Sequence, residues 1–193
     1  MPYQLYGSQT SPFVRRIRIL LENIQYEFKE LEIFERDAQL LNKINPINQV
    51  PVLVDDGKVI WDSRQIFAYL NSFHRFQNMD WDDENSLTAI DSAMSSAVAL
   101  LLMRRSGINI DEPLMYVQRQ KERIESVLDH LAPFIREKVA TQAWDFHTIS
   151  LYAFFDWGTF RNLIDLSKRK ECLELLALHA DRSIIKETAI PKV

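Results

Sequence analysis

Alternating strand-like and helix-like patterns fill the first 76 residues of the chain. Residues 3–6 and 26–32 form short runs in which apolar and polar side chains alternate, and this period of two predicts strands. Between them, apolar side chains recur at helical spacing behind Pro12. Proline suits the first position of a helix, because its missing N–H would have no partner there. The chain is therefore predicted to open with a strand, a helix and a strand.

The same region continues with a short helix, a strand hairpin and a longer helix. The turn Asp55-Asp56-Gly57 between two apolar runs is a strong hairpin signal. Either Asp62 or Ser63 is expected to cap the helix that follows. The predicted order βαβαββα defines an α/β domain over residues 1–76. Its remaining elements are a helix at about 37–43, strands at 52–54 and 58–61, and a helix that ends near 76.

Beyond residue 76 the pattern changes from strands and helices to helices alone. Residues 77–85 are polar, acidic and weakly periodic, so they predict a linker. Residues 86–193 are expected to form an all-helical domain, a bundle whose tail from about residue 184 is loosely held. The helical patterns cover 86–105, 113–138, 149–166 and 168–180.

Composition narrows the class of protein. With 193 residues, 47% hydrophobic and 26% charged, the sequence is typical of a soluble globular protein. A net charge of −4 without a basic stripe argues against nucleic acid as a partner. No apolar run approaches the roughly 18 residues of a membrane span, and the first residues do not resemble a secretory signal. We therefore expect neither a nucleic acid nor a membrane as partner.

Cysteine and histidine usage argues against a metal centre. The single cysteine, Cys172, excludes an intrachain disulfide and a cysteine metal cluster, and it fits a reducing, cytoplasmic setting. The four histidines are scattered without an i,i+4 pair. No metal site is predicted.

The pair Val50-Pro51 stands between a turn-rich stretch and a short apolar strand. In an ordinary strand start this proline is trans, and the pair then carries no function. A cis bond would instead turn the backbone of Val50 outward and leave its N–H and C=O free to pair with an extended ligand. From the pair alone, both interpretations stay open.

Two predicted helix starts could bind charged groups. Ser11 and Ser63 each place a hydroxyl at a helix N-terminus, where free N–H groups and the helix dipole favour an anion. Asp62 could hold an ammonium group beside Ser63. A molecule with an amino-acid head, a central amide and a thiol would satisfy both starts and Val50, and glutathione has that shape. Each serine could also be a helix cap and nothing more.

The sequence resembles the glutathione transferase superfamily, strongly in the N-terminal region and by architecture only in the helical remainder. The resemblance implies a thioredoxin-like first domain with a cis proline at Pro51, an all-helical second domain and a homodimer. It also leads us to expect that Thr148 caps the central helix of the bundle. The segments that carry it are Ser11-Pro12-Phe13-Val14-Arg15-Arg16, Asn45-Pro46-Ile47-Asn48-Gln49-Val50-Pro51-Val52-Leu53 and Trp61-Asp62-Ser63-Arg64-Gln65-Ile66.

For the residues of this chain, the resemblance implies a glutathione-binding site. Glutathione would lie along Val50, with its γ-glutamyl end at Asp62 and Ser63. Gln49 stands where the family often uses a residue that reaches the glycine carboxylate, and Phe13 also belongs to the expected site. Glutathione would then be a co-substrate, and no metal is expected.

The resemblance further implies that Ser11 is catalytic. Its hydroxyl would donate to the sulfur and stabilise the thiolate that attacks a small electrophile, although Thr10 and Ser8 compete for that role and Tyr6 is a weaker candidate. Because serine replaces cysteine here, mixed-disulfide chemistry at this position is not expected, whereas conjugation, peroxide reduction, dehalogenation and isomerisation stay open. The alternatives are a non-catalytic adaptor of the stringent-starvation type and an idle glutathione-binding protein.

Overall fold

In the computed structural model, which describes residues 2–191, the chain separates into two units. The sheet unit comprises Met1–Asn78 together with Arg182–Val193, and the helical unit comprises Met79–Asp181. The predicted fold class, a thioredoxin-like βαβαββα domain followed by helices, is confirmed. The elements of the sheet unit are β1 (Tyr3–Gly7), α1 (Pro12–Leu20), β2 (Tyr26–Glu30), α2 (Ala38–Ile44), β3 (Val52–Asp55), β4 (Lys58–Trp61), α3 (Ser63–His74) and α8 (Ser183–Glu187).

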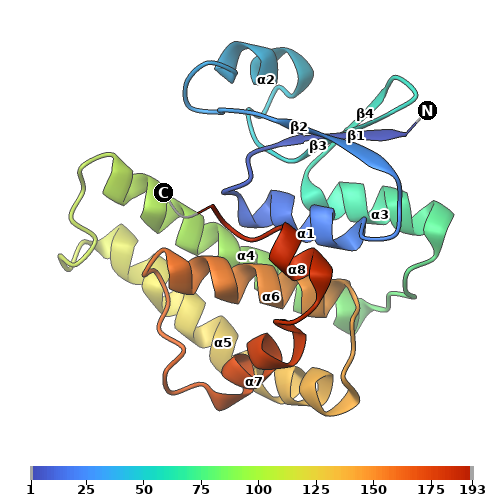
Figure 1. The fold of residues 1–193 in the computed structure, drawn as a ribbon. Helices are drawn as coiled ribbons and strands as arrows, with labels where there is room; N and C mark the ends of the chain where they lie inside the picture. Colours follow the sequence, from blue (N-terminus) through green and yellow to red (C-terminus); the bar gives the residue numbers. More distant parts are fainter. Residues whose placement is uncertain (1, 192–193) are drawn as a thin grey trace. The chain divides into compact units, whose positions relative to one another are not determined.

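The sheet has the strand order β2-β1-β3-β4. Strand β1 is parallel to β2 and antiparallel to β3, and β3 is antiparallel to β4. Helices α1 and α3 cover one face of the sheet, and α2 lies on the other (Figure 1). The sheet is therefore mixed, with the parallel pair formed by the strand–helix–strand opening and an antiparallel pair formed by the hairpin.

Alternation of side chains along the strands separates the two faces of the sheet. Val52, together with Tyr6 opposite it on β1, packs with Leu31 and Leu41 on the α2 side. The neighbouring pair Leu5 and Leu53 points to the other face, and both are 0% exposed. Each face therefore has its own apolar layer, which fixes the strand register.

The C-terminal segment corrects one expectation. Helix α8 belongs to the sheet unit, and its Ile184 and Ile185 are buried. The Nη2 of the buried Arg15 donates to the Ile185 carbonyl at 3.5 Å. The expectation of a loosely held tail from residue 184 is wrong for this helix, because two adjacent isoleucines give so short a helix an apolar side to bury. Residues 192–193 lie outside the described part of the chain.

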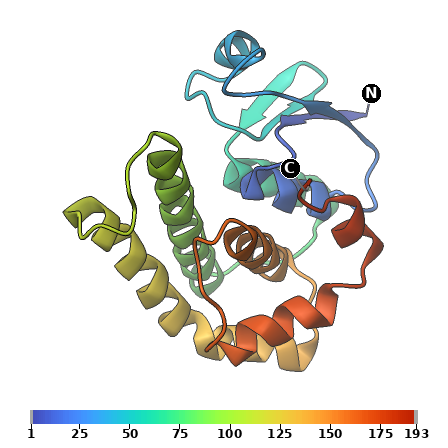
Figure 2. The ribbon, with the colours of Figure 1, turned by 60° about the vertical axis from the view of Figure 1, so that its left-hand side comes forward.

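The helical unit contains α4 (Trp81–Arg105), α5 (Met115–Thr141), α6 (Phe146–Phe160) and α7 (Lys170–His179). Figure 2 shows α6 next to α4, with α5 and α7 beside them. Every residue from Phe146 to Phe155 is buried. The apolar residues that crowd more than one side of this helix therefore did indicate a central position.

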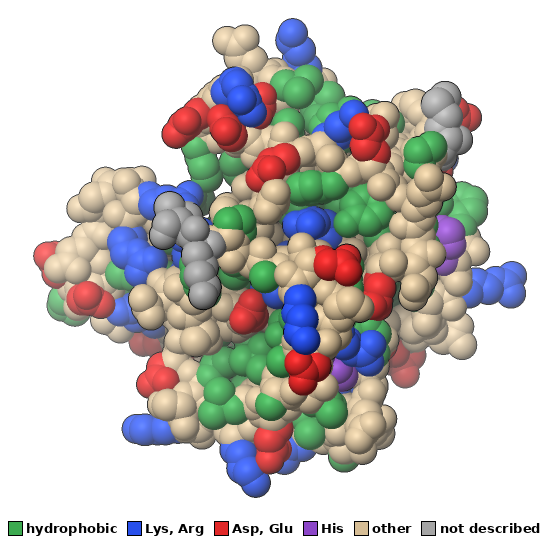
Figure 3. All heavy atoms as spheres, in the orientation of Figure 1, with side chains coloured by type: hydrophobic (Ala, Val, Ile, Leu, Met, Phe, Trp, Pro, Cys, Tyr) green, Lys and Arg blue, Asp and Glu red, His purple; other side chains and the backbone are tan. Residues whose placement is uncertain are grey.

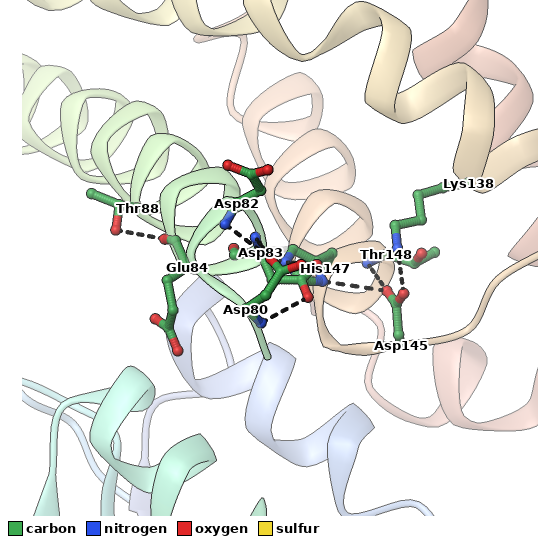
Figure 4. Close-up of polar contacts among 9 residues, drawn as sticks. All are labelled: Asp80, Asp82, Asp83, Glu84, Thr88, Lys138, Asp145, His147 and Thr148. Carbon is green, nitrogen blue, oxygen red and sulfur yellow. Dashed lines mark hydrogen bonds and ion pairs between the residues drawn. The ribbon is translucent and has the colours of Figure 1, made fainter. Parts of the chain in front are cut away.

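Helix α4 begins earlier than predicted. The Asp80 carboxylate accepts hydrogen bonds from the N–H groups of Asp82 and Asp83, and the Asp83 carboxylate accepts one from the Asp80 N–H, a reciprocal capping box (Figure 4). The prediction that the linker extends through residue 85 is therefore wrong from Trp81 onward. Carboxylates in the first helical turn are favourable because they face the positive end of the helix dipole.

The start of α6 corrects a second expectation. Asp145, not Thr148, caps this helix, and its Oδ1 accepts from the Thr148 N–H at 2.9 Å. Lys138 Nζ donates to the same carboxylate at 2.6 Å, and the buried His147 places its Nε2 3.0 Å from the Asp83 carbonyl oxygen (Figure 4). The cap lies three residues earlier than expected, because the Asp145 carboxylate accepts from an N–H group of the first helical turn.

Helix α4 also has the length and the apolar composition of a membrane span. Polar residues interrupt the apolar ones along this helix, so no continuous apolar run pointed to it in the sequence. One such helix is weak evidence, since core helices of soluble proteins pass the same test, and Leu87, Ile90 and Ala93 of α4 are 0% exposed.

On the face drawn in Figure 3, basic and acidic side chains of the described residues are interspersed.

Candidate glutathione site

The segments singled out by the sequence analysis lie at one end of the sheet. Tyr6 of β1 pairs with Val52 of β3, and Val52 pairs with Trp61 of β4. Because neighbouring strands in this row are antiparallel, the end of β1, the start of β3 and the end of β4 share one edge. Residues 7–11, 50–51 and 62–63 directly adjoin this row along the chain.

The turn after β1 ends at Ser11, the N-cap of α1. Its Oγ accepts a hydrogen bond from the Val14 N–H at 3.3 Å, so its own O–H hydrogen remains able to donate. The Phe13 N–H has no partner among residues 2–191. Gly7 allows the close approach of α1, because a Cβ there would lie 2.5 Å from a Val14 methyl group.

The hydroxyls that compete with Ser11 are bonded elsewhere. Ser8 Oγ and Thr10 Oγ1 lie 3.0 Å apart and form a hydrogen bond with each other. The Tyr6 hydroxyl donates to Gln4 Oε1 at 3.2 Å. Of these side chains, Ser11 offers the hydroxyl nearest to a helix start.

The Val50–Pro51 peptide bond is cis, the isomer that the resemblance implied. No hydrogen bond to the N–H or the C=O of Val50 occurs within the described residues. The Gln49 side chain is exposed. Val50 thus presents an unpaired backbone N–H and C=O beside the end of β1.

Asn45 holds this loop in place, and the sequence analysis missed its role. Its side chain is 0% exposed, donates from Nδ2 to the Gln49 carbonyl at 2.7 Å and accepts from the Ile47 N–H at 3.1 Å. Asn48, at φ 53°, turns the chain between them. The signal was present in the Asn45-Pro46 pair, which is typical of a turn start.

At the third segment, Asp62 rather than Ser63 caps α3. Its Oδ1 accepts from the Arg64 N–H at 2.7 Å, and its backbone has φ 71°. Such a conformation costs a non-glycine residue about 1–3 kcal/mol and is concentrated at binding sites. Ser63 follows as the first helical residue, and its N–H has no partner in the described part of the chain.

Arg16 joins two of these segments and was also missed. Its side chain is 1% exposed, its Nη2 donates to Ser63 Oγ at 2.6 Å, and its guanidinium lies 5.1 Å from the centre of the Phe13 ring. Charged residues are seldom fully buried, so the sequence alone did not give Arg16 a role in the site. The dense apolar pattern on both sides of Arg15-Arg16 was the available signal. Arg16 gives the Ser63 end of the site a positive charge.

Other reactive or metal-binding groups are poorly placed. Cys172 is 0% exposed, and burial raises the pKa of its thiol to about 12, so it stays protonated at neutral pH. Among residues 2–191, no group of at least three His, Cys, Asp or Glu side chains could hold a metal ion.

Comparison with known proteins assigns the sheet unit to a family. Residues 5–76 match the family described as glutathione S-transferase, N-terminal domain. A probable maleylacetoacetate isomerase of Caenorhabditis elegans is 40% identical over 60 residues, which are 31% of this chain and 28% of that protein. Glutathione S-transferase U21 of Arabidopsis thaliana is 28% identical over 192 residues, 90% of this chain and 82% of the relative. Three curated relatives, this isomerase among them, are 37% to 40% identical, and the chain spans only about a third of the length of each.

Solved structures share the fold of the whole chain. A glutathione S-transferase of Methylobacillus flagellatus with glutathione bound has a TM-score of 0.82 at 20% identity, covering 97% of this chain and 98% of that one. A glutathione transferase family member of Pseudomonas fluorescens with bound S-(propanoic acid)-glutathione has a TM-score of 0.79 at 20% identity, covering 99% and 98%. Residues 5–76 thus match the glutathione S-transferase N-terminal domain family, and the whole chain has the fold of glutathione S-transferases.

Proposed function

We propose that this protein is a glutathione transferase that binds glutathione in an extended conformation and joins its sulfur to a small electrophile. The observation that carries the proposal is the unpaired backbone of Val50 between two helix starts, Ser11 and Ser63, at one end of the sheet. Bound glutathione in the Methylobacillus relative supports the choice of ligand. Serine as the residue beside the sulfur is part of the proposal.

The size of the site matches an extended tripeptide. Neighbouring strands lie about 4.8 Å apart, so β1 and β4, separated by β3, are about 10 Å apart. Three extended residues span about 10 Å. A ligand whose central peptide unit pairs with the Val50 N–H and C=O, as a strand would, therefore reaches towards both helix starts.

Each end of the proposed ligand has a complementary group. The Ser63 N–H and hydroxyl would donate to the γ-glutamyl carboxylate, with the Arg16 charge behind them. The free oxygen of the Asp62 carboxylate would accept from the ammonium group. At the glycine end, the exposed Gln49 amide would donate to the second carboxylate. Phe13 would contribute its backbone N–H near the sulfur.

Ser11 would act as a hydrogen-bond donor, not as a nucleophile. A cysteine thiol has a pKa near 8.5, and lowering it by about 2 units corresponds to about 2.7 kcal/mol of preferential binding of the anion. The Ser11 O–H and the start of α1 would together supply this stabilisation. The thiol proton passes to solvent, a carbon–sulfur bond forms at the electrophile, and a leaving group departs or a neighbouring carbon takes a proton from water.

The two alternative functions differ in what they require of the site. An adaptor of the stringent-starvation type does not need an unpaired backbone N–H and C=O at Val50 for a ligand. An idle glutathione-binding protein does not need a hydrogen-bond donor at Ser11. The Ser11 hydroxyl, with its hydrogen available, favours catalysis over both. The homodimer, the cytoplasmic setting and a detoxifying role remain predictions.

Affinity chromatography and kinetics test the proposal together. Wild-type protein should be retained on immobilised glutathione and should conjugate it to a broad aromatic electrophile. Ser11→Ala should still be retained, with kcat/KM lowered about tenfold or more.

A second substitution separates catalysis from helix capping. Ser11→Gly also removes the hydroxyl, but glycine at an N-cap is only a few tenths of a kcal/mol less stable than serine, whereas alanine costs about 1 kcal/mol. The proposal requires similar losses of activity in both variants. If instead only Ser11→Ala loses activity and Ser11→Gly stays close to wild type, the loss reflects lower stability, and Ser11 is a helix cap only. Absence of retention would favour the adaptor, and retention without activity on any electrophile the idle binder.

A further inference from the structure

Arg16 reaches from α1 to the first residue of α3. The two helices pack against each other on one face of the sheet, within the sheet unit (Figure 1). The Arg16 side chain is buried, its guanidinium lies 5.1 Å from the centre of the Phe13 ring, and its Nη2 donates to Ser63 Oγ at 2.6 Å. Arg16 therefore contacts the Ser63 hydroxyl directly from a fixed position inside the unit.

The bond from Arg16 decides what the Ser63 hydroxyl can still do. Every polar atom of a guanidinium group is a donor, so Arg16 cannot accept a hydrogen bond from Ser63. Ser63 Oγ is the acceptor, and its own hydrogen finds no acceptor among residues 2–191. The Ser63 N–H likewise has no partner in this part of the chain. These consequences follow from the one bond, whatever other contacts Arg16 makes.

Burial makes these two donors selective. Ser63 is 2% exposed, so a ligand group that pairs with it is held out of water, where an unmatched donor is costly. A carboxylate accepts through both of its oxygens, and its hydrogen bonds are strengthened by its charge. A carboxamide presents one oxygen and one N–H2 group, so one of its two ends would face a donor of Ser63.

We infer that Arg16 makes the Ser63 end of the site selective for a carboxylate over a neutral carboxamide, and so for the amino-acid head of a γ-glutamyl ligand. The inference rests on the proposed function, because that function assigns Ser63 to this end of glutathione. Arg16 acts through the Ser63 hydroxyl and is a positioning residue. Its effect is to leave the Ser63 hydrogen with no acceptor other than the ligand.

Calorimetric binding of two ligands tests the inference without catalysis. One ligand is S-methylglutathione, and the other is the same compound with its glutamyl carboxylate replaced by a carboxamide. Methylation prevents ionisation of the sulfur, so the comparison does not depend on thiolate stabilisation. The wild type should bind the carboxylate at least about tenfold more tightly than the carboxamide.

Two substitutions of Arg16 separate hydrogen-bond direction from packing. Arg16→Gln should reduce the preference to less than about threefold, because glutamine offers an acceptor to the Ser63 O–H and leaves Oγ able to accept from an amide. Arg16→Lys should keep the preference, since an ammonium group also has donors only. Arg18→Gln on the same helix is the control and should leave the preference unchanged. Arg18 lies 4.6 Å from the Phe28 ring and forms no hydrogen bond with Ser63.

Thermal unfolding shows which variants fold. Arg16→Met, which fills a buried position without a polar group, replaces Arg16→Gln if that variant does not fold. A preference in Arg16→Gln or Arg16→Met equal to that of the wild type overturns the inference. So does a preference that Arg16→Lys loses as completely as Arg16→Gln, because Arg16 would then have a packing role only.

The wild type alone distinguishes this inference from the proposed function. If it binds both ligands equally well, the inference is overturned and glutathione binding stands. If it binds neither ligand, the proposed function is contradicted and the inference falls with it.

Discussion

Two serine hydroxyls in the proposed site already accept hydrogen bonds, and this fixes what they can still do. Ser11 Oγ accepts from the Val14 backbone, and Ser63 Oγ accepts from the Arg16 guanidinium. Each therefore keeps one hydrogen for a further acceptor. Because the donor to Ser63 is charged, its surroundings favour a full anion such as a carboxylate. Ser11 has only a backbone donor, which suits a sulfur that is neutral or anionic according to pH.

Ser63→Ala should separate substrate binding from catalysis. A hydrogen bond to a charged group is worth about 1.5–3 kcal/mol, so the KM for glutathione should rise about tenfold or more while kcat changes less than about twofold. Steady-state kinetics at varied glutathione concentration measures both values. Ser72→Ala, an exposed position on the same helix, serves as the control and should leave both unchanged. A collapse of kcat with KM constant would contradict the anchoring role.

At this scale the sequence predicted polar groups at turns better than buried ones. Asp62 and Ser63 were recognised because a helix start needs such residues. Arg16 and Asn45 were not, since charged and amide side chains are usually exposed, and the partner of Arg16, Ser63, lies 47 residues away along the chain. The role of Arg16 depends on a tertiary contact that local patterns do not contain, whereas Asn45 bonds within its own turn.

Among the elements, the helix starts of the helical unit carry the largest corrections. Asp80 and Asp145 both cap helices with carboxylates inside acidic or mixed stretches that read as solvated loops. The resemblance implied a threonine cap at Thr148, whereas Asp145 caps the helix. Around Asp145, Lys138 adds an ion pair that links the end of α5 to the start of α6. The cap therefore also ties two helices together.

Asp145 should make the stability of the helical unit depend on pH in the acidic range. Its burial alone would raise the pKa, but the hydrogen bonds from Lys138 and from the Thr148 N–H outweigh burial, and the pKa is lowered. A carboxyl whose folded pKa is depressed stabilises the protein above its unfolded pKa of about 3.9 and loses that contribution as pH falls through the folded pKa. At pH 7, Asp145→Ala should lower the free energy of unfolding by about 0.5–2 kcal/mol.

Urea unfolding at pH 7 and near pH 3 checks this prediction, with Asp145→Asn as the matched variant. Asparagine is as good an N-cap as aspartate but does not titrate. The advantage of the wild type over Asp145→Asn should therefore shrink on acidification. An advantage that is the same at both pH values would show that the carboxylate charge contributes nothing there.

For the molecule as a whole, the proposed site arises from topology. Antiparallel pairing of β1, β3 and β4 brings the turn that ends at Ser11 to the same edge as residues 50–51 and 62–63, although these follow it by about 40 and 50 residues along the chain. The order βαβαββα was predictable from periodicity. The cis isomer at Val50-Pro51 was predictable only from the resemblance to the family, because the pair alone left both isomers open. The return of α8 to the sheet unit was not predictable, since a short apolar segment gives no indication of which unit it will join.

The most direct test of the account is the titration of the glutathione thiol when bound. Ultraviolet absorbance of the thiolate, followed against pH in the complex and in free glutathione, gives both pKa values. We predict that the bound pKa lies about 2 units below the free value, and that Ser11→Ala and Ser11→Gly move it back towards the free value. A bound pKa equal to the free one, or a lowered pKa that both variants retain in full, would contradict the assignment of Ser11 as the group that holds the thiolate.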